Sequence, residues 1–163
     1  MDFESIREQY RPERVKLLLV GESPPSNGRF FYQRSAMTTF TSRPFEKVFD
    51  VQFLDNQEFL QFFKEKGCFL EDLSHDPVDK LPKKEREERL QAAVSDFAET
   101  INTINPPVVA IVLKKIEQFV KEAISESGLS PMTYTLPFPG NGYQNEYIDA
   151  LIPIVAEHVA EQT

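Results

Sequence analysis

The chain has 163 residues, of which 40% are hydrophobic and 27% are charged. This balance is typical of a globular protein, so we expect residues 1–163 to fold as one domain with a full hydrophobic core. The net charge of −8 disfavours binding of nucleic acid over the whole surface, so a nucleic-acid hypothesis needs a local basic patch.

Four short apolar runs predict buried strands, at residues 15–20, 68–70, 108–113 and 132–136. Periodic apolar residues between and after them predict helices at 56–66, 81–104, 114–127 and 144–161. This alternation predicts an α/β fold, a three-layer α/β/α sandwich around a central four-stranded parallel sheet. Irregular segments at 22–41, 74–81 and 138–143 each begin near the end of a predicted strand. We expect them to meet at the carboxyl edge of the sheet, where ligands bind in such folds.

The cysteine content and the lack of targeting or membrane-spanning patterns limit the cofactors and the cellular compartment that we expect. Cys68 is the only cysteine, so an internal disulfide or an iron–sulfur cluster held by several thiolates is excluded. We expect no cofactor, and no metal either, because no Cys or His cluster has ligand spacing. The chain shows no signal-peptide pattern and no apolar run long enough to cross a bilayer, which predicts a cytoplasmic protein without a membrane partner. We also expect it to be a monomer.

The first candidate motif follows the first predicted strand and reads Gly21-Glu22-Ser23-Pro24-Pro25. Glycine allows a tight turn, and the two prolines stiffen the loop. A rigidly held carboxylate suits activation of water or stabilisation of a sugar cation. The alternative is an acid that only bonds to the turn.

The second motif, at residues 27–45, interleaves cations with aromatic rings and contains no acid. Its cations are Arg29, Arg34 and Arg43, and its rings are Phe30, Phe31, Tyr32, Phe40 and Phe45. Such a stretch suits stacking on bases and pairing with phosphates. The alternative is that the rings belong to the core and the arginines are solvated.

Two further motifs follow the second and fourth predicted strands. Asp72 ends the second strand and could read a ligand edge or cap a turn, and His75 follows as a possible acid–base group or a plain loop residue. The uncharged loop at 137–142 contains two prolines and two glycines, which would let a backbone approach a ligand closely or simply make a tight connection.

The order and spacing of these motifs resemble the uracil-DNA glycosylase superfamily over roughly residues 15–155. That resemblance implies a glycosylase fold, with Glu22 orienting the attacking water and Asp72 at the place of the base-reading asparagine. It places these residues around the base: Gly21, Ser23, Pro24, Phe30, Phe31, Tyr32, Leu136, Phe138 and Asn141. It places these residues on nucleic acid: Arg29, Arg34, Arg43, Pro139, Gly140 and Gly142.

Three positions depart from the family pattern. Leu136 stands where the family has a catalytic histidine, Phe138 replaces a serine, and Asp72 replaces the asparagine. An ionised aspartate only accepts hydrogen bonds, so it disfavours uracil's O4 and suits a base edge with more donors.

The sequence supports two main hypotheses. The first is a DNA base glycosylase that acts on single-stranded DNA or on a base flipped from a duplex. The second is a catalytically inactive module that binds a nucleobase, nucleic acid or protein on the same fold. A third and weaker hypothesis, a small-molecule hydrolase using His75, lacks any nucleophile motif.

Overall fold

The computed structural model describes residues 2–161 and has a four-stranded, fully parallel sheet. The strand order is β2–β1–β3–β4. The strands are β1 (Leu17–Gly21), β2 (Cys68–Asp72), β3 (Val108–Ile111) and β4 (Met132–Thr135). The predicted α/β class, the parallel sheet and all four strands are confirmed.

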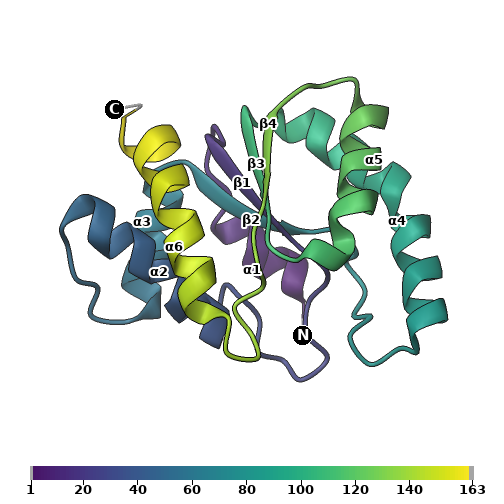
Figure 1. Ribbon diagram of the computed structural model, residues 1–163, viewed down its shortest axis with the longest axis horizontal. Helices are drawn as coiled ribbons and strands as arrows, with labels where there is room; N and C mark the ends of the chain where they lie inside the picture. The colour runs from purple at the N-terminus through teal and green to yellow at the C-terminus, as the bar shows by residue number, and fades with distance from the viewer. Residues whose placement is uncertain (1, 162–163) are drawn as a thin grey trace.

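Helices cover both faces of this sheet (Figure 1). On one side lie α2 (Ala36–Phe49), α3 (Asn56–Glu65) and α6 (Gln144–Val155), with α2 packed on α6. On the other side, α4 (Lys83–Ile104) packs on α5 (Glu117–Ser127). A 3-10 turn, η1 (Lys114–Ile116), precedes α5, and a π-helical turn, η2 (Ala156–Ala160), continues α6. This arrangement is consistent with three α/β/α layers.

Local sequence explains where these elements begin and end. Every residue of β1, β2 and β3 is buried, as expected for parallel strands covered on both faces. The Asp55 side chain accepts a hydrogen bond from the Glu58 amide and so caps the start of α3. Asn105 and Gly128 adopt the left-handed conformation that ends α4 and α5.

Two helices were not predicted. The short α1 (Phe3–Gln9) is capped by Asp2, and α2 begins at Ala36, inside a segment expected to be irregular up to residue 41. Ser35 caps α2 by accepting a hydrogen bond from the Thr38 amide. The seven-residue α1 is too short to give a periodic hydrophobic pattern. The aromatic residues before α2 favoured the interpretation of this segment as an irregular loop, so the start of α2 was not predicted.

The carboxyl ends of the strands meet at one edge of the sheet, where the loops after β1, β2 and β4 come together at the lower end of the view in Figure 1. The parallel register pairs Gly21 with Asp72, so the ends of β1 and β2 are level. Among the described residues, no helix is both long and apolar enough to cross a membrane.

Candidate functional site

A pocket of about 740 Å³ opens at this carboxyl edge. It lies where the chain reverses the order of strands, between the ends of β1 and β3, which is the usual ligand position in open α/β sheets. The predicted residues that line it are Gly21, Glu22, Ser23, Pro24, Arg29, Phe30, Phe31, Asp72, Phe138, Gly140 and Asn141. The structure therefore brings together both proposed carboxylates and parts of all four candidate motifs.

Glu22, directly after β1, pairs with an arginine that also lines the pocket. Arg86 of α4 donates from Nε to Oε2 of Glu22 at 2.8 Å, and its Nη2 contacts Oε1. The side chain of Glu22 is only 10% exposed. This bidentate ion pair fixes the direction of the Glu22 carboxylate and places a positive charge beside it.

Asp72, at the end of β2, is buried and receives a second arginine. The Nη2 of Arg7, on α1, lies 2.8 Å from Oδ2 of Asp72. The other oxygen, Oδ1, lies against Gly21, where an added Cβ would come within 2.8 Å of it. A side chain at position 21 would therefore displace the Asp72 carboxylate.

The ionisation of Asp72 reflects two opposing effects. Burial raises the pKa of its carboxyl from 3.8 to about 6, and the nearby Arg7 guanidinium limits that rise. Glu71 also raises this pKa, whereas His75 lowers it. Asp72 is thus a hydrogen-bond acceptor at neutral pH and changes its charge in mildly acidic solution.

The aromatic residues before α2 belong mainly to the core, with two reaching the pocket wall. Phe30 and Phe31 are buried and line the pocket. The prediction that Tyr32 lines the pocket is wrong. Its hydroxyl donates to the Leu70 carbonyl at 2.8 Å inside the core, which directs the ring away from the pocket lining. Phe45 is fully buried as well.

The loop after β4 places one exposed ring at the mouth of the pocket. Phe138 is 43% exposed and packs over Gly140, where an added Cβ would lie 2.9 Å from its ring. Asn141 adopts a positive φ of 56°, and Tyr143, also exposed, lines the same pocket. This loop can present a ring and open backbone to a ligand.

Five other predicted contacts lie outside the pocket. Leu136 is buried and does not line it, so the position that the resemblance matched to a catalytic histidine contributes no group to this cavity. Arg34, Pro139 and Gly142 do not line it either. Arg43 lies on α2 and pairs with Glu46 at 2.9 Å, so it makes a local surface ion pair.

Three functional candidates were missed by the sequence analysis, namely Arg86, Lys114 and Lys115, which all line the pocket. The lysines belong to η1, directly after β3, in a segment expected to be ordinary helix. Their position after a predicted buried strand is the feature of the sequence that could have identified them as candidate site residues. Together with Arg29 they bring positive charge to a pocket in which Glu22 and Asp72 already have arginine partners, while the third acid, Asp79, is exposed.

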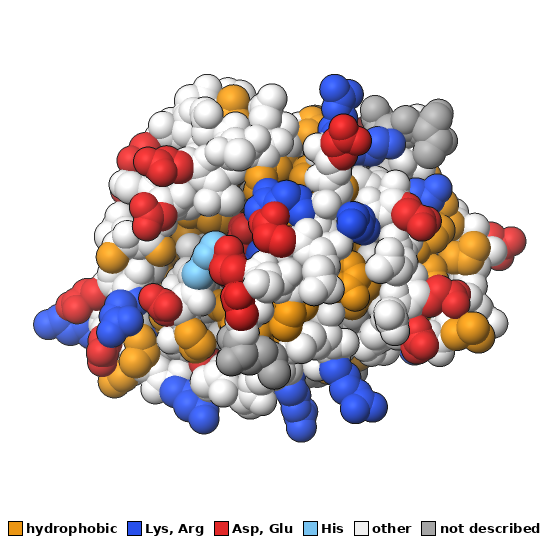
Figure 2. All heavy atoms as spheres, turned by 180° about the vertical axis from the view of Figure 1, so that it is seen from behind, with side chains coloured by type: hydrophobic (Ala, Val, Ile, Leu, Met, Phe, Trp, Pro, Cys, Tyr) orange, Lys and Arg blue, Asp and Glu red, His pale blue; other side chains and the backbone are white. Residues whose placement is uncertain are grey.

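The face seen in Figure 2 has no broad concentration of positive charge. That view shows acidic and basic side chains intermingled among hydrophobic ones, without a broad basic area. That face therefore offers no broad basic surface to an anionic ligand.

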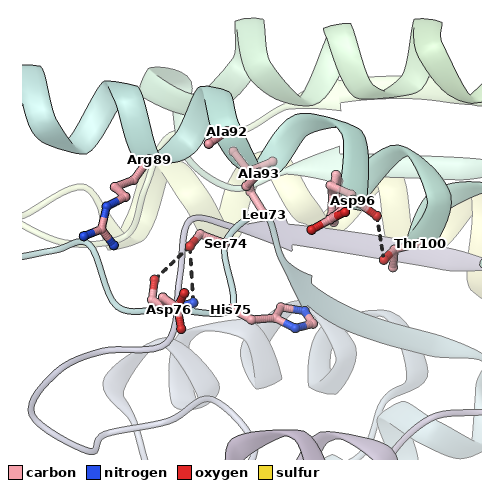
Figure 3. A pocket seen from close by; sticks show the side chains of 10 residues that line it. Leu73, Ser74, His75, Asp76, Arg89, Ala92, Ala93, Asp96 and Thr100 are labelled. Atoms are coloured by element: carbon pink, nitrogen blue, oxygen red, sulfur yellow. Dashed lines mark hydrogen bonds between the residues drawn. The ribbon is translucent and has the colours of Figure 1, made fainter.

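His75 lies outside the main pocket. It lines a smaller cavity of about 280 Å³ between the loop after β2 and α4, where Ser74 bonds to Asp76 and Thr100 to Asp96 (Figure 3). A role for His75 as an acid–base partner of Glu22 or Asp72 in the main pocket has no support from its position.

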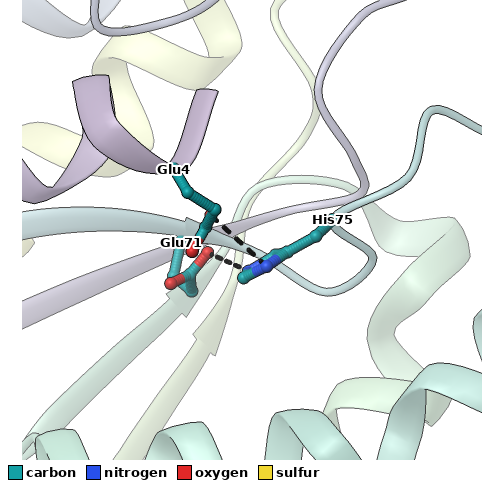
Figure 4. A group of neighbouring side chains, drawn as sticks. All are labelled: Glu4, Glu71 and His75. Carbon is teal, nitrogen blue, oxygen red and sulfur yellow. Dashed lines mark hydrogen bonds and ion pairs between the residues drawn. The ribbon is translucent and has the colours of Figure 1, made fainter. Parts of the chain in front are cut away.

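The side chains of Glu4, Glu71 and His75 form a compact cluster (Figure 4). The imidazole Nε2 is 2.9 Å from Oε1 of Glu71, and Nδ1 is 3.3 Å from Oε1 of Glu4. These groups could offer one ligand atom each to a metal ion. The buried Arg7 already pairs with both glutamates, so its positive charge opposes a cation there, and we assign no metal.

Models of known protein families give no match to this chain, and no curated protein sequence matches it either. The functional argument therefore rests on the geometry of the pocket.

Proposed function

We propose that this chain is a DNA base glycosylase on a uracil-DNA glycosylase-like fold, which hydrolyses the N-glycosidic bond of a damaged or mismatched base. The observation that carries the proposal is the meeting of Glu22 and Asp72 in one aromatic-walled pocket at the carboxyl edge of the sheet. The resemblance points to uracil or a related base, and among these the acceptor at Asp72 favours a related base that carries an amino group. The order of motifs along the chain supports the same assignment.

The geometry supplies the parts that such a reaction needs. The pocket volume lies within the usual range for a small-molecule site and accommodates a base with its sugar. Phe30 and Phe31 offer aromatic walls to a flipped base, and Asp72 offers an acceptor to its edge. Lys114 and Lys115 bring positive charge for the adjacent phosphates.

In this proposal, Glu22 acts on the sugar side of the bond. The bond between C1′ and the base nitrogen breaks, water oxygen bonds to C1′, and the departing base takes up a proton. A carboxylate held by Arg86 can orient the water and stabilise the positive charge that develops on the sugar.

The first experiment is a cleavage assay on single- and double-stranded oligonucleotides that carry uracil, hypoxanthine, xanthine or a mismatched base. Alkali-labile breaks with the native protein, lost at least about a hundredfold in Glu22→Gln, are the expected result. Glu87→Gln, on the exposed side of α4, is the matched control and should keep full activity. Equal activity of the native protein and Glu22→Gln would exclude this mechanism.

A catalytically inactive module that binds a nucleobase, nucleic acid or protein is the second candidate. Arg86 occupies both oxygens of Glu22, and the position of the family's histidine is a buried leucine, Leu136. Both observations favour binding without chemistry. If no substrate is cleaved while oligonucleotides bind in a way that depends on Asp72, this candidate replaces the glycosylase.

A further inference from the structure

The pocket acid Asp72 depends on a helix that lies outside the predicted motifs. Arg7 of α1 is completely buried and reaches across the end of β2 to the carboxylate of Asp72 at 2.8 Å. It also lies over the Phe30 ring, with 5.2 Å from Cζ to the ring centroid. Because Phe30 and Asp72 both line the pocket, one arginine supports two parts of its wall.

Arg7 leaves one oxygen of Asp72 available. Oδ2 is bonded to Arg7, whereas Oδ1 lies beside Gly21 and receives no hydrogen bond from residues 2–161. The main-chain amide of Asp72 is already bonded to Oε1 of Glu71 at 2.8 Å. The residue therefore presents a single free acceptor atom, in a direction fixed by the guanidinium.

We propose that Arg7 is a positioning residue that holds Asp72 as an ionised acceptor, so that the pocket selects a nucleobase with an amino group over its carbonyl counterpart. An amino group donates to Oδ1, whereas a carbonyl at the same place brings two acceptors together. The expected preference is for cytosine over uracil and for adenine over hypoxanthine. The inference rests on the proposed function for the nature of the ligand, a base in a DNA strand.

The charge state of Asp72 depends on groups from three elements. Arg7 faces it from α1, Glu71 precedes it on β2, and His75 lies on the loop that follows. Burial pushes its pKa upward and Arg7 opposes that effect. Removal of Arg7 should therefore move Asp72 toward the neutral acid, which has a donor like that of an asparagine amide.

The first arm of the test measures the Asp72 carboxyl by carbon-detected NMR titration. Arg7→Met should raise its pKa above that of the native protein, and Arg7→Lys should raise it less. Arg14→Met, which removes an exposed arginine outside the pocket, should leave it unchanged. An unchanged pKa in a folded Arg7→Met or Arg7→Lys variant overturns the proposal.

The second arm measures binding of short single-stranded oligonucleotides that differ only in one central base, cytosine or uracil, at pH 7.5 and low salt. The native protein should prefer cytosine by about tenfold, and Asp72→Asn should lose or reverse that preference. Adenine and hypoxanthine provide a second matched pair. Equal preference in the native protein and Asp72→Asn, or no binding of either oligonucleotide, overturns the proposal.

The two proposals fail in different ways. Base-selective binding that requires Asp72, without any strand cleavage, contradicts the glycosylase and supports the present inference. Cleavage that depends on Glu22 but does not discriminate amino from carbonyl bases supports the glycosylase and overturns the inference.

Discussion

At the scale of single residues, the burial of Asp72 couples its charge to the stability of the fold. Its pKa is raised in the folded state, so between about pH 4 and pH 6 the native protein binds more protons than the unfolded chain. The contribution of Asp72 to the free energy of unfolding must therefore fall as pH rises through this window, and stay constant above it. A rise from 3.8 to about 6 corresponds to a loss of about 3 kcal/mol.

This loss can be measured by urea unfolding at pH 4, 5, 6 and 7. Relative to Asp72→Asn, the native protein should lose stability from pH 4 to pH 6, and the difference should then level off. Asp79→Asn, which alters an exposed carboxyl on the rim of the same pocket, should run parallel to the native protein. A constant difference between the native protein and Asp72→Asn would show that the carboxyl is not perturbed by burial.

The sequence revealed the two acids of the pocket but not their partners. Glu22 and Asp72 each follow or end a recognisable buried strand, and parallel strands bring such ends to one edge. Arg7 and Arg86 lie on helices about 65 residues away along the chain from the acids they bind. The spacing of residues along the sequence does not predict these two arginine partners, because the packing of whole helices brings each arginine next to its acid.

At the scale of elements, two glycines in the left-handed conformation should differ in their importance. Gly128 ends α5 with no atom within 4 Å of an added Cβ, whereas Gly67 leads into β2 with the Arg14 carbonyl oxygen at only 3.2 Å. Gly128→Ala should cost about 1 kcal/mol through backbone strain. Gly67→Ala should cost about 2 kcal/mol, because crowding against a fixed backbone oxygen is added.

Urea unfolding of the two alanine variants at pH 7 separates these contributions. Both should keep the native slope and lower the midpoint, with the larger decrease for Gly67→Ala. The pair is matched, since each replaces a glycine with the same φ of about 80° beside a helix end. Equal midpoints would mean that the segment before β1 yields, so that the close contact costs nothing.

The helices and strands that were predicted correctly are those with the strongest hydrophobic patterns. Continuous apolar runs marked the buried strands, and long amphipathic segments marked α4 and α5. α2 was missed in part because buried threonines and aromatic residues around Ser35 read as a binding loop rather than as the start of a helix. Tertiary packing decides such segments, and a local pattern does not show it.

At the scale of the whole molecule, the electrostatic problem is that an acidic protein is proposed to bind DNA. A net charge of −8 repels a polyanion at long range, so affinity must come from cations concentrated at the pocket. The candidates that the structure places there are Lys114 and Lys115 on η1 and Arg29, which lines the same pocket. Binding should therefore be detectable at low salt and weaken steeply as salt screens these contacts.

The double variant Lys114→Ala/Lys115→Ala tests whether DNA binding depends on these two lysines at the pocket or only on the net charge of the protein. If each lysine contacts one phosphate, the slope of log affinity against log salt should become shallower by about 1.4 for a single strand. The double variant Arg14→Ala/Lys47→Ala removes the same charge from exposed positions outside the pocket, so its slope should stay native. Equal losses in the two variants would mean that the protein responds to DNA only through its total charge. A loss confined to the η1 variant would place the phosphates beside Glu22 and Asp72, where the proposed reaction requires them.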